Sequence, residues 1–259
     1  MLDALVIMLA IVIPTMIATL AFAWWYRASN TRAVYRPDFV YSGKIELVVW
    51  SIPALTIFFL GGLIWIGSHT LDPFQPIPSK LKPLEIEAVS FDWKWLFIYP
   101  DQKIATVNEL IVPVGRPLHF RITSASVFNI FFVPRLGSMI YAMNGMVSQL
   151  NLQADKPGKY LGFSAHFSGD GFPDMRFDPV AVPPAQFANW ASGVKGAPLD
   201  RVAVGQLLKQ SRAVKPYTYK GVDPAIFDAI ATEKLIGEGP QAGTSGFRQE
   251  NVKPHGGTR

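Results

Sequence analysis

The chain is organised around residues 158–175, which read GKYLGFSAHFSGDGFPDM. Residues up to about Phe163 have the composition of a β-strand, a glycine-rich turn follows, and an apolar strand resumes near Met175. A loop that joins two strands of a rigid sheet is a common place for a functional site. We therefore predict a strand–loop–strand unit here and examine what surrounds it.

Short runs rich in β-forming residues surround this loop within residues 84–183. Proline and glycine separate the runs, for example at Pro157-Gly158. Regular short strands with such turn residues between them indicate a β-sandwich of about 100 residues. We expect strands near residues 84–90, 93–99, 107–112, 117–123, 127–133, 149–154, 158–165 and 175–182.

Two long uncharged runs precede the sandwich, at residues 4–25 and 47–66. As helices they would span roughly 33 Å and 30 Å, enough for the hydrocarbon core of a bilayer. A cleaved signal peptide is the alternative for the first run, but a basic n-region is missing and the run is too long. We predict a two-helix transmembrane hairpin in residues 1–70, with spans at about 4–26 and 46–67.

The charges that flank these runs predict the orientation of the hairpin. The segment between the runs carries Arg27, Arg32, Arg36 and Lys44, whereas the next basic residue is Lys80. Cytoplasmic loops are enriched in Lys and Arg, so we place the connecting segment in the cytoplasm and both termini in the periplasm.

The remaining segments differ from the sandwich in amino-acid composition. Residues 71–83 form a proline-rich linker, which favours an extended conformation. Residues 184–236 favour a C-terminal extension of short helices, near 184–194, 199–210 and 223–235. Residues 237–259 are rich in Gly, Gln, Ser, Lys and Pro, a composition typical of a disordered tail.

The composition supports a membrane portion and excludes several classes of function. Of the 259 residues, 49% are hydrophobic and 17% are charged, below the roughly 25% of soluble domains. The chain has no cysteine, which excludes disulfides, thiolate metal sites and cysteine nucleophiles. The net charge is +5, but the basic residues are scattered, so we expect no nucleic-acid partner.

Four local motifs carry a resemblance to a known family. They are DWKWLFIYP at 92–100, NELIVPVG at 108–115, VPRLGS at 133–138 and ADKPG at 154–158. Together with the hairpin and the sandwich, they make the chain resemble subunit II of the haem-copper terminal oxidases. The likeness covers roughly residues 1–235 and is strongest for the quinol-oxidising branch, the cytochrome bo-type ubiquinol oxidases. It implies a cupredoxin-like sandwich.

The resemblance also implies what the loop at 158–175 has lost. In the branch that oxidises cytochrome c, this loop carries Cys-x3-Cys-x3-His-x2-Met and holds two copper ions. Phenylalanine and glycine provide no side-chain donor to a metal. The equivalent positions, which we call the ligand-equivalent positions, are Asn129 for the first His, Phe163 and Phe167 for the two Cys, Ala165 for the Glu between them, Gly171 for the second His, and Asp174 or, with a one-residue shift, Met175 for the Met.

We therefore expect a subunit of a proton-pumping complex that oxidises ubiquinol and reduces dioxygen to water. The resemblance implies no redox centre, metal or catalytic residue in this chain. Two haems and a copper ion would lie in subunit I. The partners would be subunit I, the smaller subunits III and IV, and the lipid bilayer of the bacterial inner membrane. The alternatives are a cytochrome c oxidase subunit with a copper relay and a free-standing, membrane-tethered periplasmic binding module.

Candidate site residues fall into three groups. Trp93 and Trp95 are predicted interface anchors, because large aromatic residues dominate protein contacts. Met139, Met143 and Met146 also suit an interface, since methionine fills irregular gaps. His119 and His166 could in principle bind copper with a methionine, but a blue-copper site also needs a thiolate.

A further candidate, outside these three groups, is Glu46, at the start of the second predicted helix. On physical grounds alone it is a solvated first-turn acid, favoured by the helix dipole and paired with Lys44 or Arg36. In haem-copper oxidases, a glutamate of subunit II at this place lies at the cytoplasmic mouth of a proton path. The resemblance therefore implies that Glu46 is a proton-path entry residue.

Overall fold

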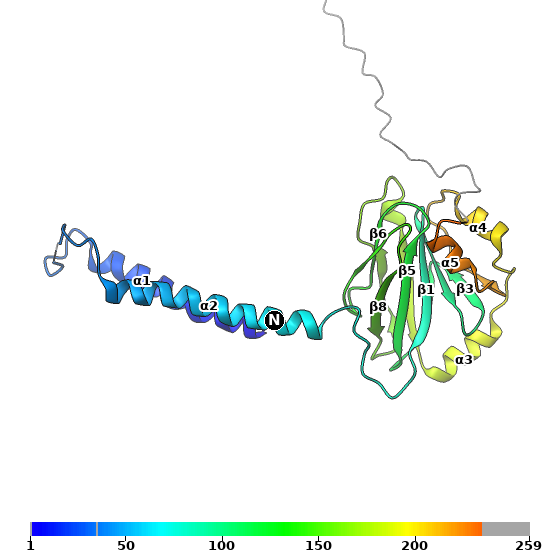
Figure 1. Cartoon of the computed structure of the whole chain (residues 1–259), viewed down its shortest axis with the longest axis horizontal. Coiled ribbons are helices and arrows are strands. Elements are labelled where there is room, and N and C mark those ends of the chain that lie inside the picture. The colour runs from blue at the N-terminus through cyan, green and yellow to red at the C-terminus, as the bar shows by residue number, and fades with distance from the viewer. Residues whose placement is uncertain (1, 35, 235–259) are drawn as a thin grey trace, which may run out of the picture. The chain divides into compact units, whose positions relative to one another are not determined.

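The computed structural model describes residues 2–34 and 36–234, and the chain divides into two compact units, Met1–Asp72 and Pro73–Arg259 (Figure 1). The predicted architecture of two apolar helices and a β-sandwich is confirmed. The predicted tail at 237–259 lies outside the described residues.

The first unit is a pair of long helices, α1 (Leu2–Trp25) and α2 (Gly43–Thr70). Both are long and apolar enough to cross a membrane. The hydroxyl groups of Thr15, Thr19 and Thr56 each donate to the carbonyl oxygen four residues earlier, at 2.7, 2.8 and 2.7 Å. These polar side chains are thus satisfied within their own helix, as the apolar core of a bilayer requires.

The second unit contains two sheets that pack face to face. The first sheet has the strand order β12-β3-β2-β1-β5-β8, and the second has the order β4-β11-β10-β6-β7, with β9 paired to β11. The strands are β1 (Leu84–Phe91), β2 (Lys94–Tyr99), β3 (Ile104–Val107), β4 (Glu109–Pro113), β5 (Pro117–Ser124), β6 (Asn129–Phe132), β7 (Ile140–Ala142), β8 (Ser148–Gln153), β9 (Gly158–Lys159), β10 (Gly162–Ser164), β11 (Arg176–Val182) and β12 (Tyr217–Lys220).

Aromatic rings fill the space between the sheets. Phe97, Phe131 and Phe177 are almost fully buried, and the ring of Phe177 lies 5.0 Å from that of Phe97 and 5.2 Å from that of Phe131. These large side chains fill the inter-sheet core from strands of both sheets.

Two short helices, α4 (Arg201–Leu207) and α5 (Ile226–Ala231), cover the other face of the first sheet, as Figure 1 shows at the right of the sandwich. A third helix, α3 (Pro184–Gly193), instead packs Phe187 against the core between the sheets. Leu207 and Phe227 join the buried residues of β1, β2 and β3 in a second core. Every residue of β2 is buried as a result, which explains its continuous apolar sequence.

The structure differs from the sequence prediction at several strands. The predicted strand at 107–112 is two strands, β3 and β4, separated by Asn108, which has a φ of 55°. Strand β7 was missed. The extension is not wholly helical, because β12 pairs antiparallel with β3 and extends the first sheet. The C-terminal extension is thus part of the sandwich architecture.

Candidate functional site

The loop that follows β10 brings most of the ligand-equivalent positions together at one end of the sandwich. It runs from Ala165 to Met175, includes a short 3-10 turn at Phe172–Asp174, and leads into β11. Asn129, at the start of β6, lies beside its base through a hydrogen bond to Ser164.

Asn129 is fully buried in a polar network. Its Nδ2 donates to Oγ of Ser90 at 2.7 Å and to the carbonyl oxygen of Val127 at 3.2 Å. Its Oδ1 accepts a hydrogen bond from Oγ of Ser164 at 2.7 Å. Ser90 is 0% and Ser164 is 2% exposed. Both ends of the amide are therefore engaged, and Asn129 is a structural residue.

The two phenylalanines occupy different environments. Phe163 is half-buried, and its ring lies 5.5 Å from that of Phe132 in an edge-to-face contact. Phe167 is 71% exposed and packs against Phe172 at 5.7 Å. Ala165 and Asp174 are exposed. The strand therefore directs one of the two cysteine-equivalent side chains to a packed position and the other to the surface.

Trp93 holds the loop in place. Its Nε1 donates to the carbonyl oxygen of Ser168 at 2.9 Å, and its ring covers Gly171. A Cβ atom at Gly171 would lie 2.2 Å from the Trp93 ring, so the backbone approaches too closely for any side chain. The histidine-equivalent position is thus restricted to glycine by the indole.

The C-terminal extension also contacts Trp93. The guanidinium carbon of Arg212 lies 5.4 Å from the centre of the Trp93 ring, and Arg212 also pairs with Asp170 at 3.1 Å. Nζ of Lys94 donates to the carbonyl oxygen of Lys209 and to Oγ of Ser211, both at 2.6 Å. Burial lowers the pKa of Lys94. The segment at 209–212 therefore fastens the β1–β2 turn to the loop.

Trp95 contradicts its predicted role as an interface anchor. Its side chain is 0% exposed, and its ring lies 5.4 Å from that of Phe131 within the core. Its backbone N–H donates to Oδ1 of Asn108 at 2.8 Å. The prediction was wrong because β2 is covered on both faces, so a tryptophan on this strand has no surface to offer a partner.

The side chains at the ligand-equivalent positions do not fit a copper centre. Among the described residues, no group of three or more His, Cys, Asp or Glu could hold a metal ion. His166 packs edge-on against Phe128 at 4.7 Å. His119 lies on β5 in the other sheet, where its Nδ1 is 3.0 Å from Oδ1 of Asn151. The two histidines therefore serve separate structural contacts.

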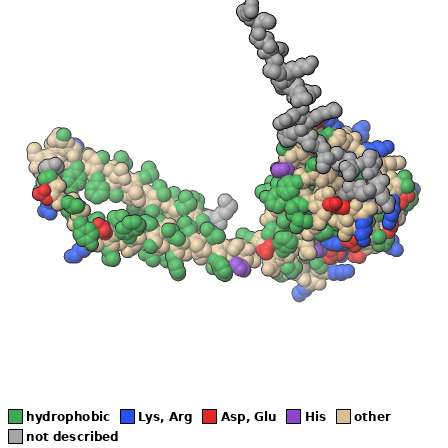
Figure 2. All heavy atoms as spheres, turned by 45° about the horizontal axis from the view of Figure 1, so that its top comes forward, with side chains coloured by type: hydrophobic (Ala, Val, Ile, Leu, Met, Phe, Trp, Pro, Cys, Tyr) green, Lys and Arg blue, Asp and Glu red, His purple; other side chains and the backbone are tan. Residues whose placement is uncertain are grey.

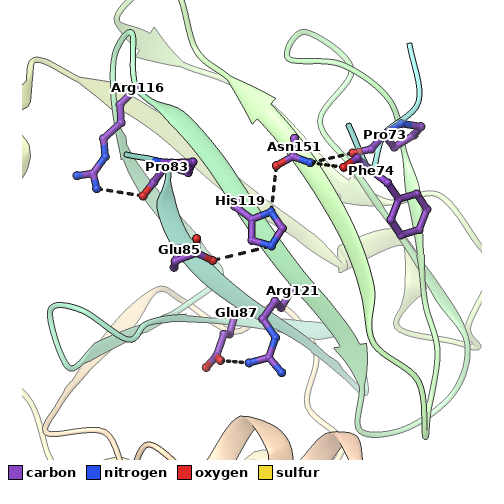
Figure 3. A network of polar contacts seen from close by, with 9 residues as sticks. All are labelled: Pro73, Phe74, Pro83, Glu85, Glu87, Arg116, His119, Arg121 and Asn151. Atoms are coloured by element: carbon purple, nitrogen blue, oxygen red, sulfur yellow. Dashed lines mark hydrogen bonds and ion pairs between the residues drawn. The ribbon is translucent and has the colours of Figure 1, made fainter. Parts of the chain in front are cut away.

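A polar stripe on the outer face of the first sheet was not predicted (Figure 3). Nδ2 of Asn151 donates to the carbonyl oxygens of Pro73 and Phe74 at 3.3 and 3.1 Å, so the stripe holds the linker. Arg121 pairs with Glu87 and with Asp228 of α5, both at 2.8 Å. The same face therefore fixes both the linker and the last helix.

Glu87 is the strongly perturbed acid of this stripe. Burial raises its pKa from 4.5 to about 7, and the neighbouring Arg121 only partly offsets that effect. Glu87 is 9% exposed. The loss of hydration on burial therefore affects the pKa of Glu87 more than its ion pair with Arg121 does. Arg121 also pairs with Asp228.

Glu46 is exposed in the first turn of α2. No ion pair joins it to Lys44 or Arg36 within the described ranges, so the pairing considered from the sequence does not form. It borders an open pocket of about 470 Å³ together with Tyr41 and Trp50. The carboxylate thus faces a recess at this end of the helix.

An apolar patch lies beside the loop, and Figure 2 shows hydrophobic side chains gathered on the surface of this unit. The ring of Phe128 lies 4.9 Å from that of Tyr141, and it also lies 4.7 Å from the ring of His166, the residue before Phe167. Methionines in this stretch pointed to an interface in the sequence, but the aromatic members were missed. The patch comprises Val127, Phe128, Met139, Tyr141 and Phe167, of which all but Phe128 are 45–71% exposed.

Comparison with known proteins supports the resemblance seen in the sequence. Residues 101–182 match the family described as cytochrome c oxidase subunit II, periplasmic domain. The chain is 48% identical to cytochrome bo(3) ubiquinol oxidase subunit 2 of Pseudomonas aeruginosa, over 89% of this chain and 70% of that protein. It is 49% identical to ubiquinol oxidase subunit 2 of Acetobacter aceti, over 88% of this chain and 75% of that protein.

The first prediction concerns the contact between Trp93 and the loop. Gly171→Ala should lower the free energy of unfolding by about 1–3 kcal/mol, because the added methyl overlaps the indole ring. Gly193→Ala is the matched control, since nothing lies within 4 Å of its added Cβ. Urea unfolding followed by tryptophan fluorescence measures both. Equal stability of the two variants would contradict the contact.

The second prediction concerns pH and Glu87. Because folding raises the pKa of Glu87 from 4.5 to about 7, its contribution to stability is complete below about pH 4.5 and is lost as pH rises through about 7. Between pH 5 and 8 the wild-type chain should therefore lose up to about 3 kcal/mol relative to Glu87→Gln.

Chemical unfolding of both proteins across that range measures the difference. Parallel stability curves for the wild-type and Glu87→Gln proteins would mean that Glu87 is ionised throughout and that the ion pair with Arg121 dominates.

Proposed function

The chain belongs to the family of ubiquinol oxidase subunit 2, and on that premise we propose that it is the second subunit of a membrane complex that oxidises ubiquinol and reduces dioxygen to water. One observation carries the proposal beyond the family: the positions equivalent to the two histidine ligands are held by hydrogen bonds and by close packing, with no metal-binding side chain at either. Asn129 uses both ends of its amide, and Gly171 has no room for a side chain.

The chain therefore acts without a redox centre of its own. The haems and the catalytic copper would belong to subunit I, which supplies the electron transfer and the oxygen chemistry. Because ubiquinol is lipid-soluble, its electrons need not enter through the external sandwich. The sandwich then serves assembly, as a rigid cap held to the membrane by α1 and α2.

The charges around the hairpin support one orientation. Arg27, Arg32 and Lys44 lie in or beside the segment that connects α1 and α2. The positive-inside rule favours a cytoplasmic position for this segment. The sandwich then lies in the periplasm, and the inner membrane of a bacterium is the proposed location.

The apolar patch is the proposed contact with subunit I. It combines large exposed side chains, among them Met139 at 54%, Tyr141 at 51% and Phe167 at 71% exposure. Exposed apolar groups gathered in this way mark protein contacts. In this proposal Trp93 contributes by holding the loop that carries Phe167, and the smaller subunits III and IV complete the complex.

Glu46 is the proposed entry residue of a proton path. It is exposed, it has no ion pair among the described residues, and it borders an open recess with Tyr41 and Trp50. In the proposed orientation it faces the cytoplasm, from which oxygen reduction takes its protons. A carboxylate there can collect protons and pass them toward subunit I.

Purification of the tagged chain in mild detergent tests the function. We expect a haem protein to co-purify, and the complex to oxidise ubiquinol with consumption of dioxygen. A chain that runs alone, with no haem absorption, would support a free-standing periplasmic module instead. Oxidation of reduced cytochrome c in place of ubiquinol would favour the cytochrome c oxidase alternative.

Replacement of Glu46 tests the proton path. Glu46→Ala should slow turnover by about several-fold, because the complex loses a group that collects and transfers protons. The haem content should stay unchanged. Glu46→Asp should be milder because it keeps a carboxylate. Oxygen consumption by assembled complexes at neutral and alkaline pH measures the effect. Unchanged turnover in Glu46→Ala would leave Glu46 as a first-turn acid that interacts with the helix dipole.

A further inference from the structure

A second surface of the sandwich has the chemistry of a binding groove. It encloses about 550 Å³ where α3 meets the end of the linker and the turn after β4. Phe187, Ala188 and Ala191 of α3 line it, together with Val114 from the turn after β4. The two alanines leave space that larger side chains would fill. The floor is therefore apolar.

The rim of the groove is cationic. Lys82 and Arg116 both border it, and no aspartate or glutamate does. Neither cation forms an ion pair within the described part of the chain. Arg116 is held in position because its guanidinium donates to the carbonyl oxygens of Lys82 at 2.8 Å and Pro83 at 3.1 Å. Among the described residues, the remaining guanidinium donors have no partner of opposite charge.

Gln102 indicates that an occupant of the groove would also need a hydrogen-bond donor. Its side chain lines the same groove, and its Oε1 atom is buried without a hydrogen-bond partner. Leaving a buried acceptor without a hydrogen bond is unfavourable, so such atoms usually have a partner. An occupant of this groove would therefore need an N–H or O–H donor.

We propose that this groove binds an extended segment of a partner polypeptide in the oxidase complex, with an acidic residue next to an apolar one. The apolar side chain packs on Phe187 and Val114, the carboxylate pairs with Lys82 and Arg116, and a backbone N–H donates to Oε1 of Gln102. Adjacent residues of one extended peptide supply all three groups at neighbouring positions, and the crosslinking test below distinguishes a peptide from a lipid. The inference rests on the proposed complex and adds a second contact, separate from the apolar patch.

Site-specific photo-crosslinking in native membranes tests the groove. The photoreactive residue p-benzoylphenylalanine replaces Ala188, which lines the groove, or Ala185, which is exposed on α3 but does not line it. After irradiation, the complex is purified and the crosslinked peptide is mapped by mass spectrometry. We expect position 188, but not 185, to capture one partner segment that contains Asp or Glu beside an apolar residue.

Charge variants make the test specific. Lys82→Glu should reduce the adduct roughly fivefold or more, whereas Lys80→Glu, two residues earlier and outside the groove, should leave it unchanged. Gln102→Leu should also reduce the adduct without lowering the melting temperature of the chain.

Four outcomes would overturn the inference: no adduct at position 188, a lipid adduct, a captured segment without an acidic residue, or an adduct that Lys82→Glu does not reduce. Co-purification of the haem protein with each variant separates failure of the groove from failure of the proposed complex.

Discussion

The contact between the Trp93 ring and the backbone of Gly171 holds the functional end of the sandwich together. It fixes the loop after β10, and the hydrogen bond from the indole to Ser168 adds direction to the packing. Arg212 lies against the same ring and pairs with Asp170, so the C-terminal extension also depends on this position. A metal centre would organise such a loop by coordination, and here an indole organises it by contact.

Hydrogen bonds and ion pairs between side chains also hold the surrounding segments in place. Asn129, Ser90 and Ser164 form a closed hydrogen-bond network where the first histidine ligand would stand. On the outer face of the first sheet, Asn151 holds the linker and Arg121 holds α5. The two segments that flank the sandwich are thus attached to adjacent strands of one sheet, β8 and β5, so both have a defined position on it.

Much of this architecture follows from sequence patterns, because the signals were local. Uncharged runs predicted α1 and α2, and apolar runs between proline and glycine turns predicted most strands. Residues whose environment depends on tertiary packing were not predictable. Trp93 and Trp95 are two positions apart in one aromatic motif, yet Trp95 is fully buried, whereas Trp93 sits in a turn with a φ of 65° and braces a loop. Strand β12 has four residues and forms only because β3 offers an edge.

We expect this member of the ubiquinol oxidase subunit 2 family to bind no copper at the loop after β10, because side-chain packing holds that loop. Copper analysis of the purified full-length chain after exposure to Cu²⁺ and a reductant, combined with its near-infrared spectrum, tests this most directly. We expect that the chain retains no copper after gel filtration and shows no near-infrared band. Two retained copper ions per chain with near-infrared absorption would contradict this expectation.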